Sequence, residues 1–140
     1  MSWQDAPLYV RAHDLARDLH ARIATWPEPH RLDLGGALCR DSRSILHGVS
    51  LALAFPLLRP AHQETADHAV LRLRVTLRLA EDLGLLPTGA AVQLHHDLTD
   101  IGRMLGGWRK REDRRQRGLP DEHSISPLSS GGGSPPRPGA

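Results

Sequence analysis

Apolar residues recur at spacings of three and four along four segments of the chain. This period places them on one face of an α-helix, so we predict helices over residues 8–26, 31–55, 61–86 and 88–111. The stripe of the last segment consists of Leu94, Leu98, Ile101, Leu105 and Trp108. Prolines and short connections separate the segments. Four amphipathic helices joined by short links predict an all-α fold, an antiparallel four-helix bundle.

Residues 71–79, LRLRVTLRL, also fit a second pattern. They alternate between apolar and polar residues, which alone is typical of a half-buried β-strand. The wider window carries a helical stripe with spacings of four, three, four and three, and no other segment alternates to supply a partner strand. That stripe consists of Ala66, Val70, Leu73, Leu77 and Ala80. We therefore predict a helix here, with Gly84 as its stop signal.

The composition of the chain changes near residue 113. We predict that residues 1–112 form the bundle and that residues 113–140 form a tail, which is basic at first and rich in Pro, Gly and Ser from about Gly118. Such a segment buries too little apolar surface to offset the entropy cost of ordering it, so we predict a disordered tail. The 140 residues fit one domain.

Several classes of protein are disfavoured by the composition. No apolar run approaches the ~18 residues that a membrane span needs. The start of the chain lacks the basic-then-apolar pattern of a signal peptide. Cys39 is the single cysteine, which excludes an intramolecular disulfide and a cysteine-built zinc site. We therefore expect a cytoplasmic protein.

The sequence offers little support for an enzyme. The nine histidines include no HExxH motif, and the adjacent His95 and His96 point about 100° apart on a helix. His96 and Asp100 share a helical face, but two ligands are too few for a metal site. We expect no catalytic residues, no metal and no cofactor.

The charge of the chain is unevenly distributed. Residues 1–108 carry eleven Arg against twelve acidic residues, whereas residues 109–117 carry six basic residues against two acidic ones. Such a patch can neutralise RNA or DNA phosphates, or it can be a solvated helix end whose cations complement the helix dipole. Two arginines of the third segment share a helical face as well. The candidate nucleic-acid-binding residues are Arg74, Arg78, Arg109, Lys110, Arg111, Arg114, Arg115 and Arg117.

The last predicted helix contains three glycines within residues 101–110, IGRMLGGWRK. Each glycine costs about 1 kcal/mol relative to alanine inside a helix. We therefore predict that Gly102, Gly106 and Gly107 allow a neighbouring helix or subunit to approach closely, with a hinge as the alternative. Trp108 closes the apolar stripe, which favours a core or subunit contact over base stacking.

Residues 101–110 resemble the C-terminal helix signature of the Avd family, the accessory variability determinants of diversity-generating retroelements. Further matches are the start of the first helix at Pro7-Leu8-Tyr9, the start of the second at Leu34-Gly35, and residues 77–86, LRLAEDLGLL. The resemblance covers residues 6–111. The broader relatives are small four-helix-bundle proteins encoded in intervening sequences of bacterial ribosomal RNA genes.

The resemblance implies a four-helix bundle that assembles into a barrel-shaped homopentamer. It also implies a protein that binds the reverse transcriptase of the retroelement together with template RNA or cDNA, and that supports mutagenic retrohoming without being the polymerase. Two alternatives stay open: an unrelated RNA-binding role of the same fold, and a protein–protein adaptor. The net charge of −1 over residues 1–108 favours the adaptor.

Overall fold

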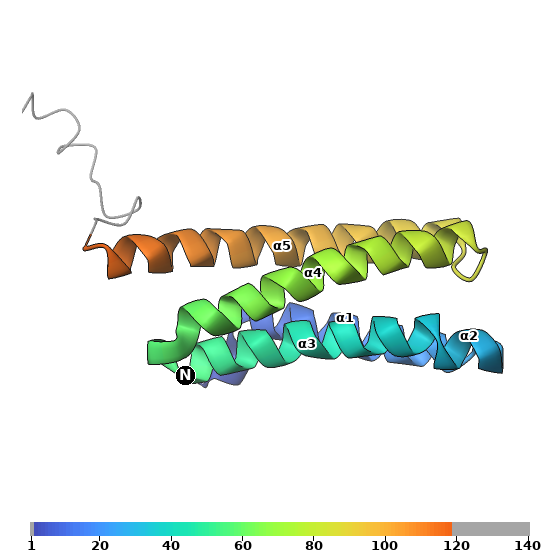
Figure 1. The fold of residues 1–140 in the computed structure, drawn as a ribbon, viewed down its shortest axis with the longest axis horizontal. Helices are drawn as coiled ribbons and strands as arrows, with labels where there is room; N and C mark the ends of the chain where they lie inside the picture. The colour runs from blue at the N-terminus through green and yellow to red at the C-terminus, as the bar shows by residue number, and fades with distance from the viewer. Residues whose placement is uncertain (1, 119–140) are drawn as a thin grey trace, which may run out of the picture.

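Residues 2–118 are described by a computed structural model, and every regular element in this part of the chain is a helix (Figure 1). The four long helices are α1 (Pro7–Ile23), α3 (Leu34–Ala54), α4 (Arg59–Asp82) and α5 (Thr88–Gln116). The short elements are η1 (Trp3–Asp5), α2 (Glu28–Leu32) and η2 (Pro56–Leu58). The helix predicted at residues 71–79 is thereby confirmed against the strand alternative. The predicted disordered tail lies almost entirely outside the described residues.

The four long helices form an antiparallel bundle, as predicted. Helix α3 packs against α1 on one side and α4 on the other, α4 packs against α5, and α5 contacts α1. Figure 1 shows that α5 extends past the other helices at its C-terminal end, which is also the end where the N-terminus lies. None of the helices in residues 2–118 combines the length and apolar character that a membrane crossing requires.

The predicted apolar stripes form the core. The largest fully buried apolar side chains come from all four long helices, and each contributes about 1.5–3 kcal/mol through its burial. They are Leu19, Leu38, Ile45, Val49, Leu73, Leu77, Leu94, Leu98, Ile101 and Leu105. Ser42, the polar residue within the stripe of α3, is also buried, and its hydroxyl donates to the Cys39 carbonyl oxygen at 2.8 Å. A polar side chain therefore fits in the core because it has a hydrogen-bond partner.

Several helix boundaries differ from the prediction. Helix α1 ends at Ile23 rather than at residue 26, and α4 covers Arg59–Asp82 rather than residues 61–86. The helix expected over residues 31–55 is split at Asp33, whose φ of −92° and ψ of −90° lie outside the helical region. The preceding short helix α2 begins with Glu28 and Pro29, a position where proline is tolerated. At the other end of the chain, α5 continues to Gln116 rather than ending at residue 111, because Glu112 still packs against the start of α4. Gly118, with a φ of +71°, follows this helix.

Glycine allows α3 and α4 to approach each other closely. A β-carbon on Gly48 would lie 2.9 Å from both the Ala66 β-carbon and the His62 carbonyl oxygen. The glycines predicted to serve this purpose lie elsewhere, on α5. No backbone atom of another helix in residues 2–118 lies among the nearest neighbours of a β-carbon built on Gly102, Gly106 or Gly107. Among the described residues, the glycine-dependent close contacts therefore lie on α3: at Gly48 against α4, and at Gly35, where a β-carbon would lie 2.5 Å from the Ile23 side chain.

Helix α4 carries apolar residues on two of its faces. Leu73 and Leu77 are buried in the core, whereas Leu71, Val75 and Leu79 are 61%, 63% and 48% exposed. The alternation within residues 71–79 arises because a helix places these two sets on different sides. We call Leu71, Val75 and Leu79 the outer apolar face of α4.

Candidate nucleic-acid interface

Three of the six basic residues at the end of α5 are paired with carboxylates of the same chain. The Arg109 Nη1 atom lies 2.7 Å from an Asp67 carboxylate oxygen of α4. Arg115 lies 3.4 Å from Glu112, and Arg117 lies 3.3 Å from Asp113. The positive charge of these three arginines is therefore partly neutralised within the bundle.

The other three basic residues have no carboxylate within 4 Å among residues 2–118. Lys110 and Arg111 are exposed, and Arg114 is half-buried. Arg103, one residue after Gly102, is also exposed and without such a carboxylate. At 100° per residue, these four side chains leave α5 within an arc of about 100°. We call them the cationic face of α5.

The cationic face surrounds a stretch of nearly bare helix backbone. A β-carbon on Gly106 would meet nothing within 4 Å, and one on Gly107 would meet only the Arg111 Nη1 atom, at 3.5 Å. The cost of these two glycines, about 1 kcal/mol each, is not recovered by packing within residues 2–118. Such a surface allows a ligand or a second molecule to approach the backbone closely.

The two candidate arginines of α4 differ in how they lie relative to the cationic face. Arg74 is half-buried between α4 and α5, where its Nη1 atom donates to the Thr99 hydroxyl at 3.2 Å. It lines a hollow together with Arg103, a member of the cationic face. Arg78 is exposed and pairs with Asp82 at 3.4 Å, one turn further along the same helix.

A buried ionic contact holds the last turns of α5 against the start of α4. The side chains of Arg59 and Glu112 are 13% and 9% exposed, and their nearest nitrogen and oxygen atoms lie 3.5 Å apart. The Arg59 Nε atom also donates to the Ala52 carbonyl oxygen at 2.8 Å. Its guanidinium lies 5.6 Å from the centre of the Trp108 ring, within the range of a cation–π contact. Trp108 itself is half-buried and packs against the core.

This contact changes how the charge of the patch should be counted. From sequence, Glu112 is expected to weaken the whole basic patch. In the structure its carboxylate pairs with Arg115, but it is buried against Arg59 and is not displayed beside Lys110 or Arg114. Sequence reasoning missed Arg59, which lies more than fifty residues away along the chain. It also missed Arg103, although a signal was present, because residues 103, 110 and 114 share one helical face.

The metal-ligating and nucleophilic side chains of the described residues are dispersed or paired. In residues 2–118, no three histidine, cysteine or carboxylate side chains come together to hold a metal ion. The Asp100 carboxylate near His96 is shared with Arg11, which approaches it to 3.1 Å. Burial raises the pKa of the Cys39 thiol, and the nearby Arg43 charge offsets this only in part. A raised pKa makes this thiol a weaker nucleophile at neutral pH.

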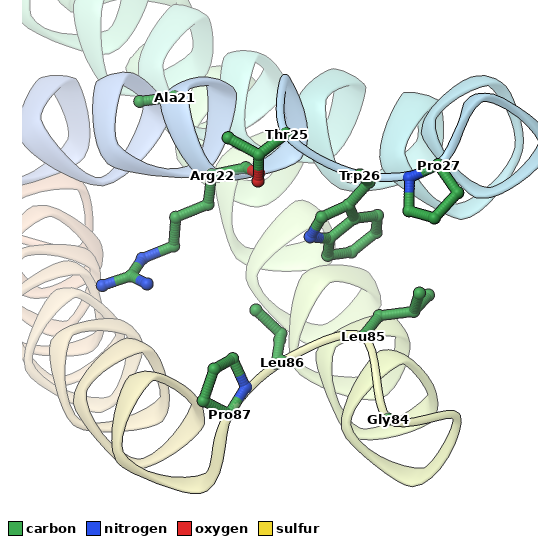
Figure 2. A pocket seen from close by; sticks show the side chains of 9 residues that line it. All are labelled: Ala21, Arg22, Thr25, Trp26, Pro27, Gly84, Leu85, Leu86 and Pro87. Carbon is green, nitrogen blue, oxygen red and sulfur yellow. The ribbon is translucent and has the colours of Figure 1, made fainter.

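A hollow of about 680 Å³ lies at the opposite end of the bundle from the cationic face (Figure 2). It lies between the end of α1 and the connection from α4 to α5, and its walls include Trp26, Leu86 and Pro87. Among residues 2–118, Arg22 is the single charged side chain that lines it. One charged group cannot supply the acid–base pair that a catalytic site usually requires.

The fold and this surface define a four-helix-bundle protein with an unneutralised cationic helix face. No family model, no curated protein and no solved structure matches the chain. The resemblance to the Avd family therefore rests on the sequence motifs alone.

Proposed function

We propose that this protein is a non-enzymatic nucleic-acid-binding scaffold that uses the cationic face of α5. The observation that carries the proposal is the placement of Arg103, Lys110, Arg111 and Arg114 without carboxylate partners in residues 2–118, around the open backbone at Gly106. Phosphates are the natural ligands of such a surface, because arginine forks its hydrogen bonds onto phosphate oxygens.

The dimensions of the face fit a nucleic-acid backbone. With a rise of 1.5 Å per residue, Arg103 and Arg114 lie about 16 Å apart along the helix axis. The phosphates of one strand of a duplex advance about 3.4 Å each along the duplex axis, so a helix that lies parallel to this axis spans roughly five of them. Contacts to phosphates position a protein without reading bases, and the expected binding is therefore independent of sequence.

The proposed biological role follows the resemblance to the Avd family. In that role the cationic face holds template RNA or cDNA, while another surface holds the reverse transcriptase of the retroelement. Assembly into a homo-oligomer, a pentamer by resemblance, multiplies each weak contact. The outer apolar face of α4 supports an assembly of this kind, because Leu71, Val75 and Leu79 remain about half or more exposed.

A salt titration of RNA binding tests the proposal. If four phosphate contacts form, affinity for a single strand falls about 50-fold between 50 and 200 mM salt. The double variant Lys110→Gln/Arg114→Gln removes two contacts, which lowers this fall to about sevenfold. The matched control is Arg31→Gln/Arg40→Gln, which changes the net charge equally on exposed residues of α2 and α3.

The control is expected to retain the steep salt dependence. Equal losses in both double variants would show that net charge, and not the cationic face, governs binding. Point variants suit this test better than truncation after Trp108, because truncation removes Glu112 and leaves Arg59 buried without its carboxylate. Such a loss would destabilise the bundle as well as remove cations.

The outer apolar face of α4 also favours a second candidate function, a protein–protein adaptor. An adaptor needs an exposed apolar surface and does not need a cationic one. Absence of RNA binding by the unmodified protein at 50 mM salt would favour the adaptor, and the reverse transcriptase would be the first partner to test.

A further inference from the structure

A second hollow, of about 440 Å³, adjoins the cationic face. It lies where the beginning of α1 and the end of α3 meet α5. Its apolar walls include Leu53 of α3 together with Met104 and Trp108 of α5. Gly107 leaves one side of the hollow without a side chain.

Two members of the cationic face also line this hollow, Arg103 and Arg111. Neither has a carboxylate within 4 Å among residues 2–118, so both guanidinium groups are available to an anion. The hollow thus combines an apolar cavity with two cations. A nucleotide has the complementary chemistry, because a flat, largely apolar base is joined through its sugar to an anionic phosphate.

We propose that this hollow receives one unpaired base of a single strand whose phosphates lie on the cationic face. The inference rests on the proposed function and deepens it by naming the form of nucleic acid. Bases of a duplex are paired and stacked, whereas a single strand can turn a base outward against apolar and guanidinium surfaces. The protein should therefore prefer single strands that carry bases over strands with the same phosphates and no bases.

The larger hollow shown in Figure 2 lacks this combination. It is lined by Arg22 alone among charged side chains and lies at the other end of the bundle from the cationic face. The hollow beside Met104 is continuous with the cationic face through Arg103 and Arg111, which belong to both. One strand can therefore engage both features at once.

A comparison of two DNA strands tests the base site in the full-length protein. The probes are a labelled 12-nucleotide oligothymidylate and the same strand with abasic residues at its six central positions, both followed by fluorescence polarisation. Stacking of one base contributes enough that we expect about tenfold tighter binding of the intact strand. The measured quantity is the ratio of the two dissociation constants.

Two glycines of α5 supply a filling variant and its control. Gly107→Leu places a side chain in the hollow, and among residues 2–118 the first atom of that side chain would meet only the flexible end of Arg111. Gly89→Leu adds the same side chain in the first turn of α5, at an exposed glycine that does not line the hollow and whose β-carbon would meet none of the described residues within 4 Å. Both changes replace glycine by a better helix former, so neither is expected to unfold α5.

We expect the ratio to fall to about one in Gly107→Leu and to stay near ten in Gly89→Leu, as in the unmodified protein. Gly107→Met serves as a second filling variant if the leucine variant is unstable. Because each ratio is measured within one variant, a change in assembly affects both strands alike.

Each of the remaining outcomes would contradict the base site, its location or the proposed function. A ratio of about one in the unmodified protein would overturn the base site and leave the hollow to an apolar side chain of a protein partner. An unchanged ratio in Gly107→Leu, or an equal loss in Gly89→Leu, would place the base contact outside the hollow. Failure of both strands to bind at low salt would refute the proposed function itself.

Discussion

The close approach of α3 to α4 at Gly48 gives a quantitative prediction about stability. Replacing Gly48 by alanine adds a β-carbon 2.9 Å from the Ala66 β-carbon and the His62 carbonyl oxygen. Carbon atoms pack best at about 3.5–4.0 Å, so the two helices must separate by roughly half an ångström or more. Overpacking of this kind typically costs 1–3 kcal/mol.

A matched variant separates this cost from helix propensity. Gly106→Ala is also a helical glycine-to-alanine change, but its β-carbon meets nothing within 4 Å. Each variant gains about 1 kcal/mol from helix propensity. Since that gain is common to both, the difference in stability between Gly48→Ala and Gly106→Ala isolates the overpacking cost of about 1–3 kcal/mol.

The assay is urea denaturation followed by circular dichroism, at several protein concentrations so that any contribution of assembly is visible. We expect Gly106→Ala to be more stable than the unmodified protein and Gly48→Ala to be the less stable of the two variants by about 2 kcal/mol. For a chain of this size the same difference corresponds to a melting temperature lower by about 6 °C. Equal stability of the two variants would refute the close packing of α3 on α4.

Three further predictions concern other parts of the bundle. Glu112→Leu leaves Arg59 buried without its carboxylate and should lower the free energy of unfolding by about 3 kcal/mol in urea titrations. Adding Arg59→Met should restore most of the loss, because the buried charge is then removed as well. No recovery in the double variant would contradict this reasoning. Because burial raises the pKa of the Cys39 thiol, iodoacetamide should react more slowly with the folded protein at pH 8 than with the chain unfolded in urea, and equal rates would count against it. Val75→Glu, on the outer apolar face of α4, should reduce the mass of any assembly measured by sedimentation. Val92→Glu should not reduce it, although Val92 of α5 is equally exposed. An unchanged mass in Val75→Glu would place the interface elsewhere.

The number of long helices was predictable because each carries a stripe long enough to reveal its period. The stripe through Leu73 and Leu77 identified α4 as a helix even though residues 71–79 alternate like a strand. The break at Asp33 was not predictable in the same way, because the apolar stripe of α3 begins immediately after it. The extension of α5 past residue 111 depends on Glu112 packing against α4, a contact that periodicity alone does not reveal.

The location of the candidate site could be predicted from the sequence, but the residues that form it could not all be predicted. The basic run at the end of α5 was visible in the sequence, yet Arg109 is paired with Asp67, forty-two residues earlier in the chain. Such partners depend on which helices lie side by side, so they emerge only in the folded bundle. Arg103 was accessible to sequence reasoning, since it lies two turns before Lys110 on the same helical face. The hollow beside Arg103 was not accessible to sequence reasoning, because the walls of this hollow come from three separate elements.

The two apolar faces of α4 have a consequence for the folding of the chain. In an extended conformation the five apolar residues of 71–79 would all lie on one side of a strand, so an unfolded α4 presents a segment prone to intermolecular β-pairing. Arginines occupy most of the intervening positions, and their charge opposes the stacking of identical segments from different chains. Formation of the helix breaks up this one-sided segment, because Leu73 and Leu77 enter the core while Leu71, Val75 and Leu79 move to the outer face. Packing of α4 onto α3 therefore also withholds the segment from pairing with other chains.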